Sequence, residues 1–226
     1  AHIEPQFGTI TAADGSTLHY QIYLPTDFDP SKTYPAVQYV YGGPHAQNVR
    51  RGWQGATPQM FAQRGYVYFT IDNRGSWNRG RDFEGQLPRH MGSVEVQDQL
   101  AGLDWLKSQP FVDAENVGIW GWSYGGYMTL MTTLQAPGAY AAGVSGAPVT
   151  DWALYDTAYT ERYMDHPDNN ADGYEQSSVF AHLGNYETPL LLIHGMADDN
   201  VIFANGVRLY NELQAQGSSF EMMTYP

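Results

Sequence analysis

The sequence predicts an α/β protein in which a mostly parallel central sheet carries helices on both faces. Segments with strand character alternate with segments of helical periodicity, and the later strands are apolar at nearly every position. Strands that are apolar throughout are typical of parallel sheets covered on both sides. At 226 residues the chain fits one large domain with a sizeable core, and we expect a single domain over 1–226.

The first half is expected to start with two strands, Gln6–Thr11 and Thr17–Leu24, joined by a turn at Ala13-Asp14-Gly15. The segments YPAVQYVYGG and YVYFTIDNRG are predicted strands, and a helix over Thr57–Gln63, capped by Gly65, lies between them. A longer helix is predicted over Ser93–Gln109, because apolar residues recur there at helical spacing, at positions 96, 100, 103 and 106.

The second half is expected to alternate in the same way. The predicted elements are, in order, the strand NVGIWGW, the helix Tyr124–Leu134, the strand Tyr140–Ser145, the strand TPLLLIHG at 188–195, the helix Ile202–Gln214 and the strand SFEMMTY. Residues 147–187 are too long for a simple crossover and are rich in Tyr, Asp and Pro. Such an insertion is expected above the carboxyl edge of the sheet, where α/β proteins bind ligands.

The composition narrows the possible functions. A formal net charge of −13 argues against a nucleic-acid partner, because phosphate binding needs clustered Lys and Arg. The absence of cysteine excludes a disulfide scaffold, a thiolate zinc site and a cysteine nucleophile, and no cofactor or metal is expected. No apolar run reaches the roughly 20 residues that a membrane span needs. A chain that starts on Ala with no signal-peptide pattern is expected to be a mature or excised piece.

The segment GWSYGG carries the candidate nucleophile, Ser123. Gly-x-Ser-x-Gly between a strand and a helix is the nucleophile elbow of α/β-hydrolases, in which a strained backbone lifts the serine oxygen clear of the sheet edge. The bare pattern also occurs in ordinary glycine-rich turns. Here the strand NVGIW precedes it and a helical segment follows, as the mechanism requires.

The acid of such a site follows the serine at the end of a later strand, and a histidine follows the acid. Asp198, the first of two adjacent carboxylates after TPLLLIHG, is the candidate acid, whereas Asp199 is expected to cap the helix 202–214. No histidine follows Asp198. His194 is expected to be a buried structural residue, and His45 a loop residue near the oxyanion site. The others are His2, His19, His90, His166 and His182, and none is a credible base.

The segments VYGGP, DNRGS, GWSYGG and HGMADDNV together resemble the catalytic domain of the prolyl oligopeptidase family of serine peptidases. The segment YDTAYTERYM is similar to its dipeptidyl-peptidase IV branch, of bacterial type. The resemblance implies a peptidase that releases Xaa-Pro, or Xaa-Ala, dipeptides from peptide amino termini through an acyl-enzyme. It also implies a homodimer and a periplasmic or membrane-associated setting.

The resemblance also implies site residues. Ser123 matches the nucleophile and Asp198 the triad acid, while Tyr41 and the backbone N–H of Tyr124 match the oxyanion donors. Asn200 matches a residue that binds the substrate backbone beside the scissile proline. The residues matching the walls of the proline pocket are Tyr124, Val149, Trp152, Tyr155, Tyr159 and Val201. Without the resemblance, Trp152, Tyr155 and Tyr159 would be interpreted as one face of a core helix.

The chain departs from the family pattern at both ends. The resemblance implies an amino-terminal β-propeller that binds the substrate amine and a triad histidine in a loop past the last strand, and residues 1–226 contain neither. We therefore expect an incomplete hydrolase domain that is inactive alone, within an active parent. Two alternatives stay open: a non-catalytic hydrolase-like binding module, and a related acylaminoacyl-peptidase or esterase.

Overall fold

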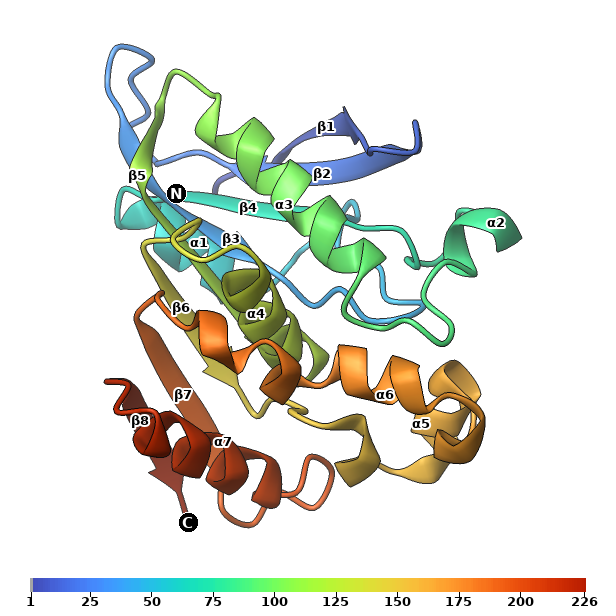
Figure 1. Cartoon of the computed structure of the whole chain (residues 1–226). Coiled ribbons are helices and arrows are strands. Elements are labelled where there is room, and N and C mark those ends of the chain that lie inside the picture. The colour runs from blue at the N-terminus through green and yellow to red at the C-terminus, as the bar shows by residue number, and fades with distance from the viewer. Residues whose placement is uncertain (1) are drawn as a thin grey trace.

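The computed structural model describes residues 2–226 and has one sheet of eight strands, in the order β1-β2-β4-β3-β5-β6-β7-β8 (Figure 1). The strands are β1 Gln6–Thr11, β2 Thr17–Tyr23, β3 Tyr34–Tyr39, β4 Val67–Asp72, β5 Val112–Trp122, β6 Ala142–Gly146, β7 Leu190–Gly195 and β8 Glu221–Tyr225. β1, β2 and β4 pair antiparallel, and every pairing from β4 to β8 is parallel. The predicted mostly parallel α/β sheet is confirmed.

Helices connect these strands. They are α1 Ala56–Gln63, α2 Arg81–Glu84, α3 Val94–Lys107, α4 Tyr124–Gln135, α5 Thr157–Met164, α6 Ala171–Ser177 and α7 Ala204–Ala215. α3, α4 and α7 lie in front of the sheet in Figure 1, and α1 lies behind it. The core fills the space between the sheet and these helices, and α4 is buried along nearly its whole length because it crosses the middle of the sheet. None of the helices in the described part of the chain could span a bilayer.

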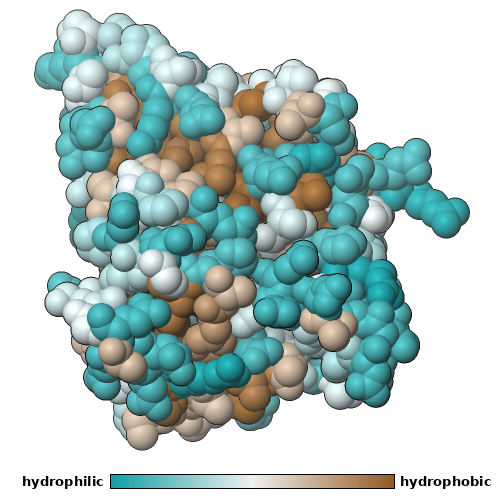
Figure 2. All heavy atoms as spheres, viewed as in Figure 1, coloured by the Kyte–Doolittle hydropathy of each residue, from teal (hydrophilic) through white to brown (hydrophobic). Residues whose placement is uncertain are grey.

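The sheet is covered unevenly. Along β7, Leu190, Leu192 and His194 are buried, whereas the alternate residues are only half-buried. The expectation of a strand buried on both faces is therefore wrong for β7. On the face opposite α4, Val144 and Trp120 line an apolar groove beside α1. On the front, hydrophilic residues cover much of the outer helices, and hydrophobic residues show mainly in the furrows between them (Figure 2).

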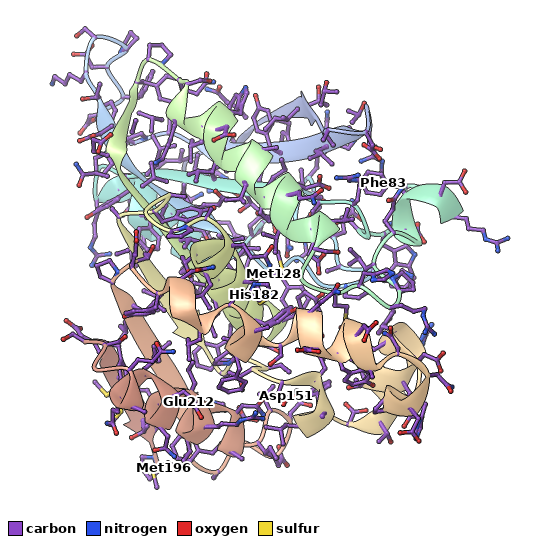
Figure 3. All side chains as sticks on the ribbon, in the orientation of Figure 1. Phe83, Met128, Asp151, His182, Met196 and Glu212 are labelled. Atoms are coloured by element: carbon purple, nitrogen blue, oxygen red, sulfur yellow. The ribbon has the colours of Figure 1, made fainter. Side chains whose placement is uncertain are left out.

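The insertion between β6 and β7 is built from short helices. It contains α5, α6 and the 3-10 turns η1 Trp152–Leu154, η2 Pro167–Asn169, η3 Val179–Ala181 and η4 Leu183–Asn185. Asp151 and Asp156 begin η1 and α5 by accepting hydrogen bonds from backbone N–H groups two and three residues ahead. Figure 3 labels Asp151, where the chain leaves β6, and Met196, where it leaves β7. The start of the insertion thus lies at the carboxyl edge of the sheet, as predicted, while η3 and η4 return along α4.

Candidate active site

Ser123 is the single residue that connects a strand to a helix. β5 ends at Trp122, α4 begins at Tyr124, and Ser123 has φ 59° and ψ −118°. This backbone conformation costs a non-glycine residue about 1–3 kcal/mol, and it persists only where the surrounding structure imposes it. That structure does so here, because the Ser123 N–H donates to the Gly146 carbonyl at 2.8 Å and the Ser123 carbonyl accepts from the Tyr127 N–H at 3.0 Å. The backbone therefore has the geometry of a nucleophile elbow.

Glycine at position 125 is needed for this turn. A Cβ built there would collide with the carbonyl oxygen of Val40, at the end of the neighbouring chain segment from β3. The first turn of α4 thus lies directly against the residues that follow β3. That close approach is what brings Tyr41 beside the serine turn, since Tyr41 is the next residue along the chain.

Tyr41 and Tyr124 lie together on the carboxyl edge. Their ring centroids are 6.1 Å apart, and a Cβ at Gly43 would come within 2.9 Å of the Tyr41 ring and 3.1 Å of the Tyr124 ring. Burial raises the pKa of Tyr41 above its usual value, so its hydroxyl keeps its proton at neutral pH. A phenol that remains protonated can donate to an oxyanion, which is the role that the resemblance implies.

Asp198 shapes the loop that follows β7. Its Oδ1 accepts the backbone N–H groups of Asn200 at 3.1 Å and Val201 at 3.0 Å, which leaves Oδ2 for another partner. The Asp198 side chain is 22% exposed. Asp199 is exposed and caps nothing: α7 begins at Ala204 without a side-chain cap, so the predicted capping role of Asp199 is wrong.

His194 has a structural role, as expected. It is fully buried, and its Nε2 lies 2.8 Å from the Val201 carbonyl, so this nitrogen carries the proton and donates it. Its Nδ1 has no hydrogen-bond partner. His45 sits in the loop after β3, with Nδ1 3.1 Å from the Tyr163 hydroxyl. Within residues 2–226 no histidine forms a hydrogen bond with Ser123.

Six residues that the resemblance assigns to the walls of a proline pocket belong to one core cluster, and we call them the aromatic cluster. They are Tyr124, Val149, Trp152, Tyr155, Tyr159 and Val201. Trp152 is at its centre, with ring centroids 5.4 Å from Tyr124, 5.9 Å from Tyr155 and 6.1 Å from Tyr159. Trp152 belongs to η1, Tyr159 to α5, and Tyr155 to the link between them. They therefore do not form one face of a single helix, which was the alternative interpretation.

A side-chain hydrogen bond also joins the cluster to the acid loop. The Tyr155 hydroxyl donates to Oδ1 of Asn200 at 3.1 Å. Because Asn200 follows Asp198 by two residues, this contact joins the insertion after β6 to the turn that Asp198 organises. The predicted substrate-binding residue and the predicted pocket wall are thus neighbours in space.

Sequence reasoning missed Glu95, in the first turn of α3. It is fully buried, and its Oε1 accepts the Tyr124 hydroxyl at 2.8 Å and the Gly92 N–H at 2.5 Å, while Oε2 accepts the Ser93 N–H at 3.1 Å. Burial raises the pKa of Glu95 above its usual value. An acidic residue in the first turn of a helix has an ordinary explanation in the helix dipole, so the sequence held no signal of this contact. The described residues contain no cluster of three or more His, Cys, Asp or Glu suited to a metal ion.

Comparison with known proteins places the chain in a family. The model of the prolyl oligopeptidase family matches residues 53–226. Mouse dipeptidyl peptidase 8 is 42% identical over 229 aligned residues, which cover 98% of this chain and 26% of that protein. The human dipeptidyl peptidase 8 matches to the same extent.

A solved structure agrees with these matches. That of Porphyromonas gingivalis dipeptidyl peptidase 4 superposes with a TM-score of 0.94 at 37% identity, covering 100% of this chain and 32% of that one. The chain thus spans about a quarter to a third of the length of these relatives. The sequence matches and the superposition agree, and the chain belongs to the prolyl oligopeptidase family of serine peptidases.

Proposed function

We propose that the intact polypeptide is a serine dipeptidyl peptidase that releases Xaa-Pro, or Xaa-Ala, dipeptides from peptide amino termini. The observation that carries this proposal is the strained Ser123 turn next to Tyr41 and the aromatic cluster. A strained serine in a hydrolase elbow supports acyl transfer, and an aromatic surface suits the flat, rigid ring of proline. The names of the relatives, dipeptidyl peptidases 8 and 4, support the same class.

The chemistry would run through an acyl-enzyme. The Ser123 oxygen attacks the carbonyl carbon of the second substrate residue, its proton passes to a histidine, and the tetrahedral oxyanion accepts hydrogen bonds from the Tyr41 hydroxyl and the Tyr124 N–H. The C–N bond then breaks as the leaving amine takes that proton. Water, deprotonated by the same histidine, attacks the ester and releases the dipeptide. Asp198 would orient the histidine through its Oδ2, which makes no hydrogen bond and lies 3.8 Å from the Nε2 of His194.

The histidine of this proposal comes from polypeptide outside residues 1–226, because the seven histidines of this chain all precede Asp198 and none bonds to Ser123. The isolated chain is accordingly proposed to turn over substrate hardly at all, since serine without a base is a poor nucleophile. Fast release of p-nitroaniline from Gly-Pro-p-nitroanilide by the isolated chain would contradict this.

The activity test uses the intact polypeptide with three substrates. Gly-Pro-p-nitroanilide should be cleaved, its acyl-blocked counterpart should not, and the Ser123→Ala variant should cleave neither. Cleavage of the blocked substrate would favour an acylaminoacyl-peptidase or esterase. Failure to cleave either, with peptide binding retained, would favour a binding module. The same preparations test two further proposals, a homodimer by light scattering and a periplasmic or membrane-associated location by fractionation.

A further inference from the structure

We propose that Glu95 is a positioning residue: by accepting the Tyr124 hydroxyl it fixes the Tyr124 ring as a wall of the aromatic cluster, and so sets how well the cluster receives proline. The inference rests on the proposed function. It goes beyond that function because it assigns specificity to a carboxyl group that would touch neither the substrate nor the reacting atoms.

The geometry of Glu95 is that of a fixed anchor. Its carboxyl group sits in the first turn of α3, with no exposed surface, and both of its oxygens are held by the backbone N–H groups of Gly92 and Ser93. A carboxyl group bound in this way cannot swing to another rotamer without leaving buried donors unpaired. The Tyr124 hydroxyl therefore meets an acceptor whose position is set by the backbone.

Tyr124 transmits that position to the site. Tyr124 comes directly after the nucleophile Ser123 in the sequence, and it is 2% exposed. Its ring lies between those of Tyr41, Tyr127 and Trp152, at centroid distances of 6.1, 5.3 and 5.4 Å. Because aromatic packing alone lets a ring shift by small amounts, the hydrogen bond at its tip is what determines how far the ring lies from Trp152.

The opposing interpretation is that Glu95 only completes the loop before α3. That role depends on the contacts to Gly92 and Ser93, and it would not involve the Tyr124 hydroxyl. Removing the hydroxyl alone separates the two roles, because Tyr124→Phe leaves the carboxyl group and its backbone donors in place. A purely structural Glu95 predicts no change in substrate preference for that variant.

The test compares kcat and KM in the intact polypeptide for Gly-Pro- and Gly-Ala-p-nitroanilide. Tyr124→Phe should lower kcat/KM for the prolyl substrate about 10- to 100-fold, mainly through KM, because a ring no longer held by its carboxylate acceptor packs less closely against the substrate proline. The prolyl-to-alanyl preference should fall as well, because the smaller side chain depends less on the wall. Labelling of Ser123 by diisopropyl fluorophosphate should be unchanged within about threefold, since the serine turn is held by backbone contacts.

Two matched variants control for the loss of any buried tyrosine hydroxyl. Tyr140 is also 2% exposed, and its hydroxyl donates to Oε1 of Gln38 at 3.1 Å. Tyr127 donates to the Ser177 carbonyl at 2.8 Å. Tyr140→Phe and Tyr127→Phe should lower the melting temperature about as much as Tyr124→Phe and leave the substrate preference intact.

Substitutions at Glu95 complete the design. Glu95→Gln keeps an oxygen that can accept the Tyr124 hydroxyl, so it should retain most of the prolyl-to-alanyl preference. Glu95→Ala should lower that preference as much as Tyr124→Phe does. In the double variant Glu95→Ala/Tyr124→Phe the preference should fall no further than in the more affected single variant, because both substitutions remove the same contact.

The outcomes separate this inference from the proposed function. If the wild-type polypeptide cleaves Gly-Pro-p-nitroanilide and Tyr124→Phe keeps the wild-type preference, as Tyr140→Phe does, only the role of Glu95 is overturned. Additive losses in the double variant overturn it too. If the wild type neither cleaves the substrate nor reacts with the fluorophosphate, the proposed function fails, and this inference fails with it.

Discussion

The Tyr155 hydroxyl donates to Oδ1 of Asn200 across 3.1 Å, and this bond engages the oxygen end of the Asn200 amide. With its oxygen engaged, Asn200 presents its NH2 group, which can donate to a substrate carbonyl. Asn200→Asp would replace that donor with a charged acceptor and add a third carboxylate to the loop that already carries Asp198 and Asp199. We expect kcat/KM for Gly-Pro-p-nitroanilide to fall by about 10- to 100-fold in the intact polypeptide.

Asn116→Asp is the control for this change. Asn116 is exposed near the amino end of β5, so the variant adds the same charge at the opposite edge of the sheet. It should keep its kcat/KM within about twofold, since exposed charges at that distance are screened. Equal losses in the two variants would show that net charge, rather than the Asn200 amide, determines the rate.

Tyr41→Phe tests the oxyanion role. Loss of one preorganised oxyanion donor typically lowers kcat by about 10²- to 10³-fold with little effect on KM. Tyr39 provides a matched control, because it is two residues earlier on the same chain segment and burial raises its pKa in the same direction. Its side chain, however, packs against Tyr68 and Trp120 rather than Tyr124. Steady-state kinetics in which Tyr39→Phe loses as much kcat as Tyr41→Phe would remove the proposed role.

Gly125→Ala tests the close approach beneath the serine turn. The added methyl group would meet the Val40 carbonyl, which belongs to the backbone and cannot move aside cheaply. We expect a loss of about 3 kcal/mol or more in the free energy of unfolding, measured by urea denaturation of the chain. Gly184→Ala is the control, because a Cβ there meets no atom within 4 Å. That variant should change the free energy of unfolding by less than about 1 kcal/mol. Similar losses of stability in Gly125→Ala and Gly184→Ala would contradict the close approach of residue 125 to Val40.

Much of this architecture was predictable from local patterns. The strand that ends at Trp122 and the helix that starts at Tyr124 were predicted, because the elbow pattern marks their boundary. The helix predicted over Ser93–Gln109 corresponds to α3, which begins one residue later and ends two residues earlier, at Val94–Lys107. The four-residue helix α2 was missed, since one turn has no periodicity to detect. Asp151 and Asp156, which begin η1 and α5, carried a capping signal that the length of the insertion obscured.

The site was less predictable, because its contacts join segments distant in sequence. Ser123 and Asp198 follow from the order of strands and functional groups in the chain. The aromatic cluster was expected only by resemblance, since rings at such spacing usually mark a core helix. The bond from Tyr124 to Glu95 spans 29 residues and two elements. No periodicity or spacing rule connects a tyrosine after the nucleophile with a carboxyl group at the start of α3.

The last prediction concerns Asp72, at the carboxyl end of β4. Asp72 is 6% exposed, and burial raises its pKa from 3.8 to about 6, although it accepts the backbone N–H groups of Asn48 and Val49. The folded state therefore binds the proton more tightly than the unfolded state. Stability from this group is full below about pH 4 and is lost as the pH rises to about 6, by about 3 kcal/mol.

Asp72→Asn removes the titrating group. The variant should be less stable than the wild type at pH 4, because its NH2 group faces one of the two N–H donors. The difference between the two proteins in the free energy of unfolding should narrow between pH 4 and pH 7. Over that range the wild type acquires a buried charge at Asp72, whereas the amide of the variant stays neutral. Urea unfolding of both proteins at several pH values measures this difference directly. A deficit that is constant over that range would mean that Asp72 titrates near its ordinary pKa, with its two N–H bonds offsetting burial.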